Sequence, residues 1–186
     1  MRKYISDMEW DKFFNAITDS VNEVRDKTMF KMAYRHGLRV SELIGIKITD
    51  LDISGRTVYI RRLKNGFSTI HPLQEETCIL ISRWLEKRSG YTLHNDNDWL
   101  FVSVRGERLS RQWVYKLSQK YGKKAGISLK IHPHMLRHAC GYALANQGLD
   151  TRLIQDYLGH RNITHTVRYT ASNPARFIRV WKSSSD

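Results

Sequence analysis

The spacing of apolar residues changes once along this chain, and that change limits the folds open to it. Over most of the 186 residues, apolar side chains recur every three or four positions, as in amphipathic helices. Between Thr57 and Leu73 they alternate instead, which is typical of strands. The sequence therefore predicts a mostly α-helical α+β fold with one small antiparallel β-sheet. A chain of this length is expected to form one compact domain, residues 1–186.

Several helix ends carry capping signals. Ser6 and Glu9 form a capping-box pattern before an apolar helical repeat. Gly37 follows His36 and can adopt the left-handed conformation that ends a helix. A short helix is then predicted to begin at Arg39. The expected helices cover residues 7–18, a stretch ending at 36, and residues 39–46, 74–88, 110–124, 134–147, 150–158 and 173–182.

The alternating segment predicts a β-hairpin. Val58 and Ile60 lie on one side of the first strand, and Asn65 with Gly66 is a dipeptide typical of tight two-residue turns. A short extended segment is also expected at residues 99–102. The hairpin is thus the only sizeable non-helical element that the sequence predicts.

The charge of the chain indicates a polyanionic partner. Lysine and arginine total 31 against 18 acidic residues, which gives a net charge of +13. Nucleic acid is the partner class that such an excess favours. A basic protein that binds no nucleic acid remains the alternative, since charge indicates a class of partner and not a chemistry.

The cysteines and the first residues indicate the compartment. Cys78 and Cys140 both lie within apolar helical patterns and are expected to be buried thiols, so a disulfide framework has no support. The chain does not begin with a signal-peptide pattern and has no apolar run long enough to span a membrane. A soluble protein of the cytoplasm, with no membrane partner, is expected.

One short motif carries the clearest chemical signal. His134 and Arg137 are three residues apart at a predicted helix start and therefore share one face. A covalent cut in DNA needs a nucleophile, cations for the charge that develops on phosphorus, and an acid for the leaving oxygen. An imidazole beside a guanidinium suits the second and third of these needs.

Each candidate residue also has an ordinary structural interpretation. His134 and His138 are four residues apart and could bind zinc, but the motif lacks a glutamate base and contains the cation Arg137. Arg39 alone is more often a solvated or capping residue, and Lys64 alone is more often a solvated charge beside a turn. In the same way, an isolated Tyr169 would usually be a packing aromatic.

Taken together and in order, these motifs resemble the tyrosine recombinase (phage integrase) family. The resemblance rests on an arginine motif, a His-x-x-Arg motif, a histidine after Leu-Gly, and a tyrosine nine residues later. In this sequence the motifs are Gly37 to Leu43, His134 to His138, Leu158 to His160, and Tyr169.

The resemblance implies a role for each matched residue. Tyr169 is the expected nucleophile, and Arg39 and Arg137 are expected to clamp the scissile phosphate, a task that suits bidentate guanidinium groups. His134 is expected either to take the tyrosine proton or to hydrogen-bond the phosphate, while His160 donates to a non-bridging oxygen.

Two further residues complete the predicted site. Lys64 matches the strand lysine of the family and is expected to protonate the leaving 5′-oxygen. If the alternation of the strand continues to the turn, Arg62 shares a face with Lys64 and is its rival for this role. Glu42 lies about one turn after Arg39 and is expected to orient it.

A narrower resemblance covers nearly the whole chain and points to the small fimbrial phase-variation invertases. It rests on the segment from Arg62 to Thr69 and on the run from His132 to Asn173. These invertases flip a promoter-bearing DNA segment between inverted repeats. The resemblance implies a dimer on each DNA site, a tetramer in synapsis, accessory DNA-bending proteins, and a catalytic domain without a separate N-terminal core-binding domain. It implies no cofactor, because exchange of one phosphoester for another needs neither ATP nor metal.

Two other functions stay open at this point. A type IB topoisomerase uses similar chemistry but relaxes supercoils without exchanging partners. A non-catalytic helical DNA-binding regulator would also explain the positive charge, although it would not need Tyr169 or Lys64. Formation of a covalent protein-DNA adduct separates both enzymes from the regulator.

Overall fold

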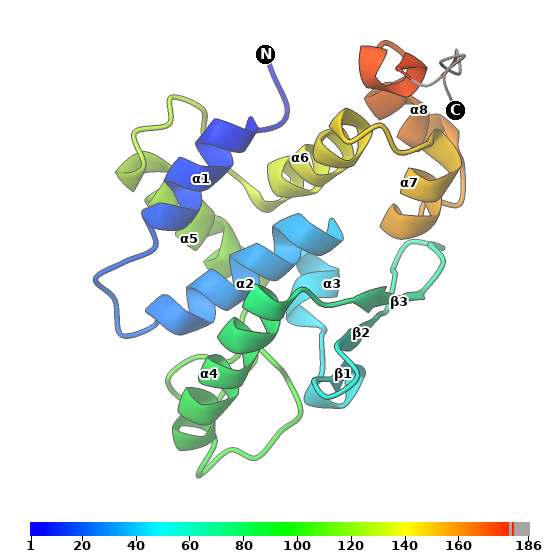
Figure 1. Ribbon diagram of the computed structural model, residues 1–186. Helices are drawn as coiled ribbons and strands as arrows, with labels where there is room; N and C mark the ends of the chain where they lie inside the picture. Colours follow the sequence, from blue (N-terminus) through cyan, green and yellow to red (C-terminus); the bar gives the residue numbers. More distant parts are fainter. Residues whose placement is uncertain (179, 181–186) are drawn as a thin grey trace.

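A computed structural model describes residues 1–178 and 180 (Figure 1). The described part of the chain is mostly helical, with one small sheet, as predicted. The helices are α1 (Asp7–Asn15), α2 (Glu23–His36), α3 (Val40–Ile44), α4 (Glu75–Tyr91), α5 (Arg111–Lys124), α6 (Pro133–Asn146), α7 (Thr151–Leu158) and α8 (Thr164–Thr170), with the 3₁₀ turns η1 (Ile48–Asp50) and η2 (Pro174–Phe177).

Most predicted helix ends agree with the structure. The Ser6 and Glu9 side chains form the predicted capping box at the start of α1. Gly37 ends α2 in the left-handed conformation, with φ of 60° and ψ of 45°. The third helix starts at Val40, with Arg39 as its N-cap residue, one position later than predicted.

The C-terminal part departs from the prediction. The structure has a helix at α8 that was not predicted, and it has only the short turn η2 within the predicted helix over residues 173–182. Residues 179, 181 and 182 of that prediction lie outside the described residues. Three threonines in the seven residues of α8 give a low intrinsic helix propensity, so packing rather than sequence preference must hold this helix.

The sheet has three antiparallel strands in the order β1 (Leu51–Asp52), β2 (Thr57–Ile60) and β3 (Thr69–Pro72). Val58 pairs with His71 and Ile60 with Thr69. In place of the predicted extended segment at residues 99–102, there are only isolated bridges, from Trp99 to Lys47 and from Val102 to Arg108.

The predicted two-residue Asn-Gly turn is wrong. Strand pairing stops at Ile60, and the turn that follows is centred on Lys64 and Asn65, both with positive φ (54° and 60°). The Gly66 amide closes this turn by donating to the Leu63 carbonyl at 3.1 Å. After the turn the loop contacts the end of α7 and not the sheet, because the amide of Phe67 donates to the carbonyl of Gly159 at 3.2 Å.

Two apolar cores underlie these elements. Helix α2 crosses the middle of the molecule and packs against α1, α4 and α6 (Figure 1). The larger core includes Phe13, Phe30, Trp84 and Tyr121, none of which is exposed to solvent. Each such side chain contributes about 1.5–3 kcal/mol by leaving water. The smaller core lies between α6, α7 and α8 and contains Tyr169.

The cysteines are both free and buried, as the sequence predicts. No helix of the described chain combines the length and the apolar character needed to cross a membrane.

Candidate active site

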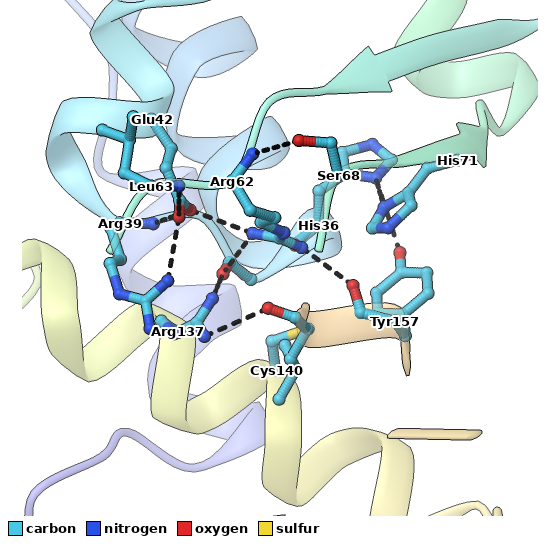
Figure 2. Close-up of polar contacts among 12 residues, drawn as sticks. His36, Arg39, Glu42, Arg62, Leu63, Ser68, His71, Arg137, Cys140 and Tyr157 are labelled. Atoms are coloured by element: carbon cyan, nitrogen blue, oxygen red, sulfur yellow. Dashed lines mark hydrogen bonds and ion pairs between the residues drawn. The ribbon is translucent and has the colours of Figure 1, made fainter. Parts of the chain in front are cut away.

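The centre of the candidate site is the carboxylate of Glu42, which is buried at the first turn of α3 (Figure 2). Its Oε1 accepts from Arg39 Nη1 at 2.9 Å and from the Leu63 amide at 3.2 Å. Its Oε2 accepts from the Arg39 amide at 2.9 Å and from Arg62 Nη1 at 3.0 Å. Burial alone would raise the pKa of Glu42, but Arg62 and these backbone amides outweigh it and lower the pKa. Glu42 is therefore an anion that holds two arginines.

Arg62 lies inside the protein and ties three segments together. Its side chain has no exposed surface. Besides Glu42, it donates to the carbonyls of Gly37 at 3.3 Å, His36 at 2.9 Å and Tyr157 at 2.8 Å. The guanidinium thereby links the ends of α2 and α7 to the strand that leaves the sheet (Figure 2).

Lys64 points elsewhere, so the prediction that Arg62 and Lys64 share a face is wrong. The alternation fails because strand pairing has already ended at Ile60 and the chain turns at Lys64 with positive φ. Arg62 is buried and engaged, whereas Lys64 is exposed at the tip of the loop. The structure thus separates two neighbouring cations that sequence alone could not separate.

Arg137, in the first turns of α6, is the third guanidinium of the group. It is buried and donates through Nη1 to the Gly37 carbonyl and through Nη2 to the Leu158 carbonyl at 3.1 Å. Burial, with the charges of Arg39 and Arg62 added, lowers the pKa of Arg137 to about 10. Gly37 is required here on two grounds: its φ is left-handed, and a Cβ would lie 2.3 Å from the Leu158 side chain.

We call Arg39, Glu42, Arg62 and Arg137 the arginine cluster. Within the described residues, Glu42 forms ion pairs with Arg39 and Arg62, and none of the three guanidiniums pairs with any other carboxylate. The cluster therefore holds two positive charges more than negative ones. Such an excess at a partly buried position favours the binding of an anion such as a phosphate.

Arg39 is the member of the cluster that lines a cleft of about 270 Å³. The cleft brings together three predicted site residues, Arg39, Lys64 and His134. Arg111 and Tyr115 of α5 also line it, although no sequence motif selected them. The full lining is Arg39, Val40, Ser41, Leu63, Lys64, Arg111, Tyr115, Pro133 and His134.

His160 follows the left-handed Gly159 at the end of α7 and is buried. Its Nδ1 is 2.7 Å from the hydroxyl of Thr166, which is fully buried. Burial, together with Arg137 and Arg39, lowers the pKa of His160 to about 3, so the ring is neutral. If the threonine hydroxyl donates to Nδ1, the proton of the ring is on Nε2, where it can be donated to an anion.

Tyr169 lies on α8 with its side chain packed against α6. It is 3% exposed, and its hydroxyl is 2.9 Å from Nδ1 of His138. Gly141 makes room for the ring, since a Cβ there would come within 2.6 Å of it. Burial raises the pKa of Tyr169, and the charges of Arg137 and Arg168 oppose this shift.

The contact between His138 and Tyr169 was missed from the sequence. The available signal was that His138 follows Arg137 directly on the same predicted helix. The spacing of His134 and His138 had suggested only zinc. Within the described residues, no group of three or more His, Cys, Asp or Glu side chains is placed to hold a metal ion.

Comparison with known proteins places this geometry in context. The model of the phage integrase family matches residues 3–176. The type 1 fimbriae regulatory protein FimE of Escherichia coli (strain K12) is 48% identical over 184 residues, which cover 99% of this chain and 93% of FimE. FimB of the same strain is 46% identical over 180 residues, or 97% of this chain and 90% of FimB.

Among solved structures, XerH site-specific recombinase bound to palindromic difH substrate, in a post-cleavage complex, has a similar fold. Its TM-score is 0.81 at 26% sequence identity, with 94% of this chain and 51% of the XerH chain covered. This chain thus spans about half the length of that recombinase.

Proposed function

Since this chain belongs to the phage integrase family, the tyrosine recombinases, we propose that it cuts and rejoins double-stranded DNA at specific sites through Tyr169. We further propose that it inverts a promoter-bearing segment between inverted repeats and so switches fimbrial genes. The name and the similarity of FimE and FimB over nearly their whole length support this finer role.

The observation that carries the proposal is the arginine cluster at the cleft. A phosphodiester is an anion, and its transition state for cleavage gathers more charge on the non-bridging oxygens. Arg39 is 24% exposed at the cleft, and both Nη atoms of Arg137 keep a second N–H besides those given to carbonyls. Arg39 and Arg137 are therefore the proposed phosphate ligands, and Arg62 holds the cluster together.

The remaining residues supply the proton transfers. Lys64 lies free at the cleft and is the proposed acid for the leaving 5′-oxygen. His160 is the proposed donor to a non-bridging oxygen, with Thr166 fixing its ring. Attack by Tyr169 leaves a 3′-phosphotyrosine and a free 5′-hydroxyl, and a 5′-hydroxyl from the partner duplex later attacks that ester.

The energetics of this exchange make ATP unnecessary, because one phosphoester replaces another. The guanidiniums provide charge that a metal would supply in other nucleases. Cleavage is therefore expected to persist in excess chelator. Loss of cleavage with chelator, restored by magnesium or zinc, would assign the chain to a different class of nuclease.

The proposed partners follow from the same function. We propose a homodimer on each DNA site and a homotetramer when two sites meet, with DNA-bending proteins as accessory factors. The DNA-bound XerH structure supports the DNA partner, and the net charge of +13 is consistent with it. The proposed location is the bacterial cytoplasm, at the nucleoid.

The test is a denaturing gel after incubation with supercoiled DNA that carries two inverted repeats. The wild-type protein should form a covalent adduct and invert the segment, and Tyr169→Phe should do neither. The variant should still bind duplex DNA, with affinity falling by orders of magnitude between about 50 and 200 mM salt. An adduct with Tyr169→Phe contradicts the assignment. Relaxation without inversion would instead indicate a topoisomerase, and binding without any adduct a regulator.

A further inference from the structure

Helix α6 carries two histidines near Tyr169, and the structure gives them different surroundings. His138 is buried, and its Nδ1 makes the 2.9 Å contact with the Tyr169 hydroxyl. His134 is exposed and lines the cleft with Arg39 and Lys64. The two rings lie edge to face with their centroids 4.4 Å apart. Within the described residues, the hydroxyl of Tyr169 has no other hydrogen-bond partner than His138.

The state of the His138 ring suits a hydrogen-bond acceptor. Burial, and after it the neighbouring His134 and the charge of Arg168, lower the pKa of His138 to about 4. The ring is therefore neutral near pH 7 and can carry its proton on Nε2, which leaves the Nδ1 lone pair free for the phenol. The tyrosine hydroxyl then donates to Nδ1.

The position of His138 also links the phenol to the helix that carries Arg137. Arg137 precedes His138 directly on α6, and its charge acts on the phenol of Tyr169. A hydroxyl held by His138 therefore stays within the electrostatic influence of the guanidinium that is proposed to bind the scissile phosphate. His134, on the cleft side, is left to contact the phosphate itself.

On the basis of the proposed function, we infer that His138 is the general base that takes the Tyr169 proton during strand cleavage. The phenolic O–H bond breaks and its proton moves to Nδ1, while the phenolic oxygen forms a new bond to phosphorus. The bond from phosphorus to the 5′-oxygen breaks, and Lys64 protonates that oxygen. On rejoining, the imidazolium of His138 returns the proton to the departing phenolic oxygen.

A weak base can perform this step because the proton leaves late. As the phenolic oxygen binds phosphorus it loses its affinity for the proton, so transfer becomes favourable while the bond forms. The negative phosphate also offsets the charges of Arg137 and Arg168, which otherwise disfavour an imidazolium at His138. Base catalysis of this kind typically contributes about 10²–10⁴-fold to a rate.

The test combines substitutions of His138 with a more acidic phenol at position 169. His138→Asn keeps an amide that can accept the hydrogen bond but cannot take the proton. Cleavage by His138→Asn should fall by about 10²–10⁴-fold, as should that of His138→Ala. A trifluorotyrosine at position 169, whose phenol is more acidic, should restore most of the rate in both variants.

His134→Ala is the matched control, because a lost phosphate contact is not repaired by a more acidic phenol. Its cleavage rate should stay low with trifluorotyrosine. If His138→Asn cleaves at the wild-type rate, or if His134→Ala is the variant that trifluorotyrosine rescues, His138 is not the base. Since His138→Ala opens a cavity and could fail to fold, the asparagine variant decides the question. Failure of the proposed function would differ from both outcomes, because the wild-type protein would then form no adduct at Tyr169.

Discussion

Arg62 and Arg137 are anchored by backbone carbonyls at the ends of α2 and α7, whereas α8 is anchored by side-chain hydroxyls. The hydroxyls are those of Thr166, Tyr169 and Thr170, which contact His160, His138 and Thr151. The apolar support differs as well. Five buried residues form the core around α7 and α8 (Cys140, Ala145, Ile154, Leu158 and Tyr169), and the other core is far larger.

This difference indicates that the arginine cluster is the rigid half of the site and that α8 is the half more able to move. Carbonyls at helix ends cannot shift without breaking the helices, so the arginine cluster is preorganised for the phosphate that we propose it binds. The small core around α8 contributes little free energy against a shift of this helix. Because Tyr169 is buried against α6, we expect α8 to shift when DNA enters the cleft, with the Tyr169 hydroxyl keeping its contact with His138, while the arginine cluster keeps its geometry.

The largest expected effect is on the cleavage rate, and it distinguishes the role of Lys64 on the loop from that of the arginine cluster. Lys64→Ala should slow cleavage of ordinary DNA by about 10²–10⁴-fold, because the leaving oxygen then lacks its acid. Replacing the 5′-bridging oxygen with sulfur removes most of that proton demand and should restore cleavage. Arg39→Ala should show no rescue, since its loss concerns the non-bridging oxygens. Equal rescue of both variants, or of neither, would leave Lys64 as a DNA-backbone contact.

Glu42→Gln tests whether the arginine cluster depends on its single carboxylate. The variant leaves Arg62 buried without a counter-ion and should lower the free energy of unfolding by about 3–5 kcal/mol. Asp156→Asn is the matched control: Asp156 pairs with Arg152, and the two side chains are 58% and 76% exposed. Chemical denaturation should show a change below about 1 kcal/mol for the control. Similar losses in the two variants would mean that Glu42 is not the centre of a buried cluster.

Gly141→Ala tests the seating of α8, which carries the proposed nucleophile. The added methyl group would lie 2.6 Å from the Tyr169 ring, and such overpacking costs about 1–3 kcal/mol. Hydrogen exchange should show lost protection in residues 164–170, with the larger core unaffected. Gly90→Ala in α4 meets no atom within 4 Å and should be stabilising by about 0.5–1 kcal/mol. Unchanged exchange in α8 would show that Gly141 does not hold Tyr169 in place.

The smallest expected effect is a loss of stability in mild acid. Burial, and to a smaller extent the neighbouring charges, lowers the pKa of His36 to about 3 and that of His71 to about 4. Between these values and the ordinary value near 6.5, the unfolded chain binds more protons, so stability must fall as the pH falls. Each histidine contributes at most about 1.4 kcal/mol per pH unit in that window. Denaturation at pH 7.5 and 5.5 should show the loss, and His71→Gln should reduce it. An unchanged pH slope in His71→Gln would exclude His71 as a source of the effect.

Local signals were enough to predict much of the fold. Gly37 could be identified as a left-handed cap because few residues other than glycine adopt that conformation, and the capping box fixed the start of α1. Helix α8 could not be predicted, because three threonines in seven residues oppose a helix and only packing against α6 and α7 overcomes this. Tertiary contacts decide such short elements.

The sequence could propose members of the candidate site but not their contacts. The resemblance selected Arg39, Arg137 and Tyr169 by order and spacing. It could not show that Arg62 turns inward, because that depends on where strand pairing ends and on the carbonyls that α2 and α7 present. It also could not show which of two histidines on α6 meets Tyr169. Long-range contacts of this kind leave no periodic pattern in a sequence.

The most direct measurement is to map the covalent link between protein and DNA. The adduct would be trapped by denaturation, digested with nuclease and protease, and its modified peptide sequenced by mass spectrometry. We predict a nucleotide joined through its 3′-phosphate to Tyr169 and a free 5′-hydroxyl on the other strand end. A link to any other residue, or a link through a 5′-phosphate, would contradict it.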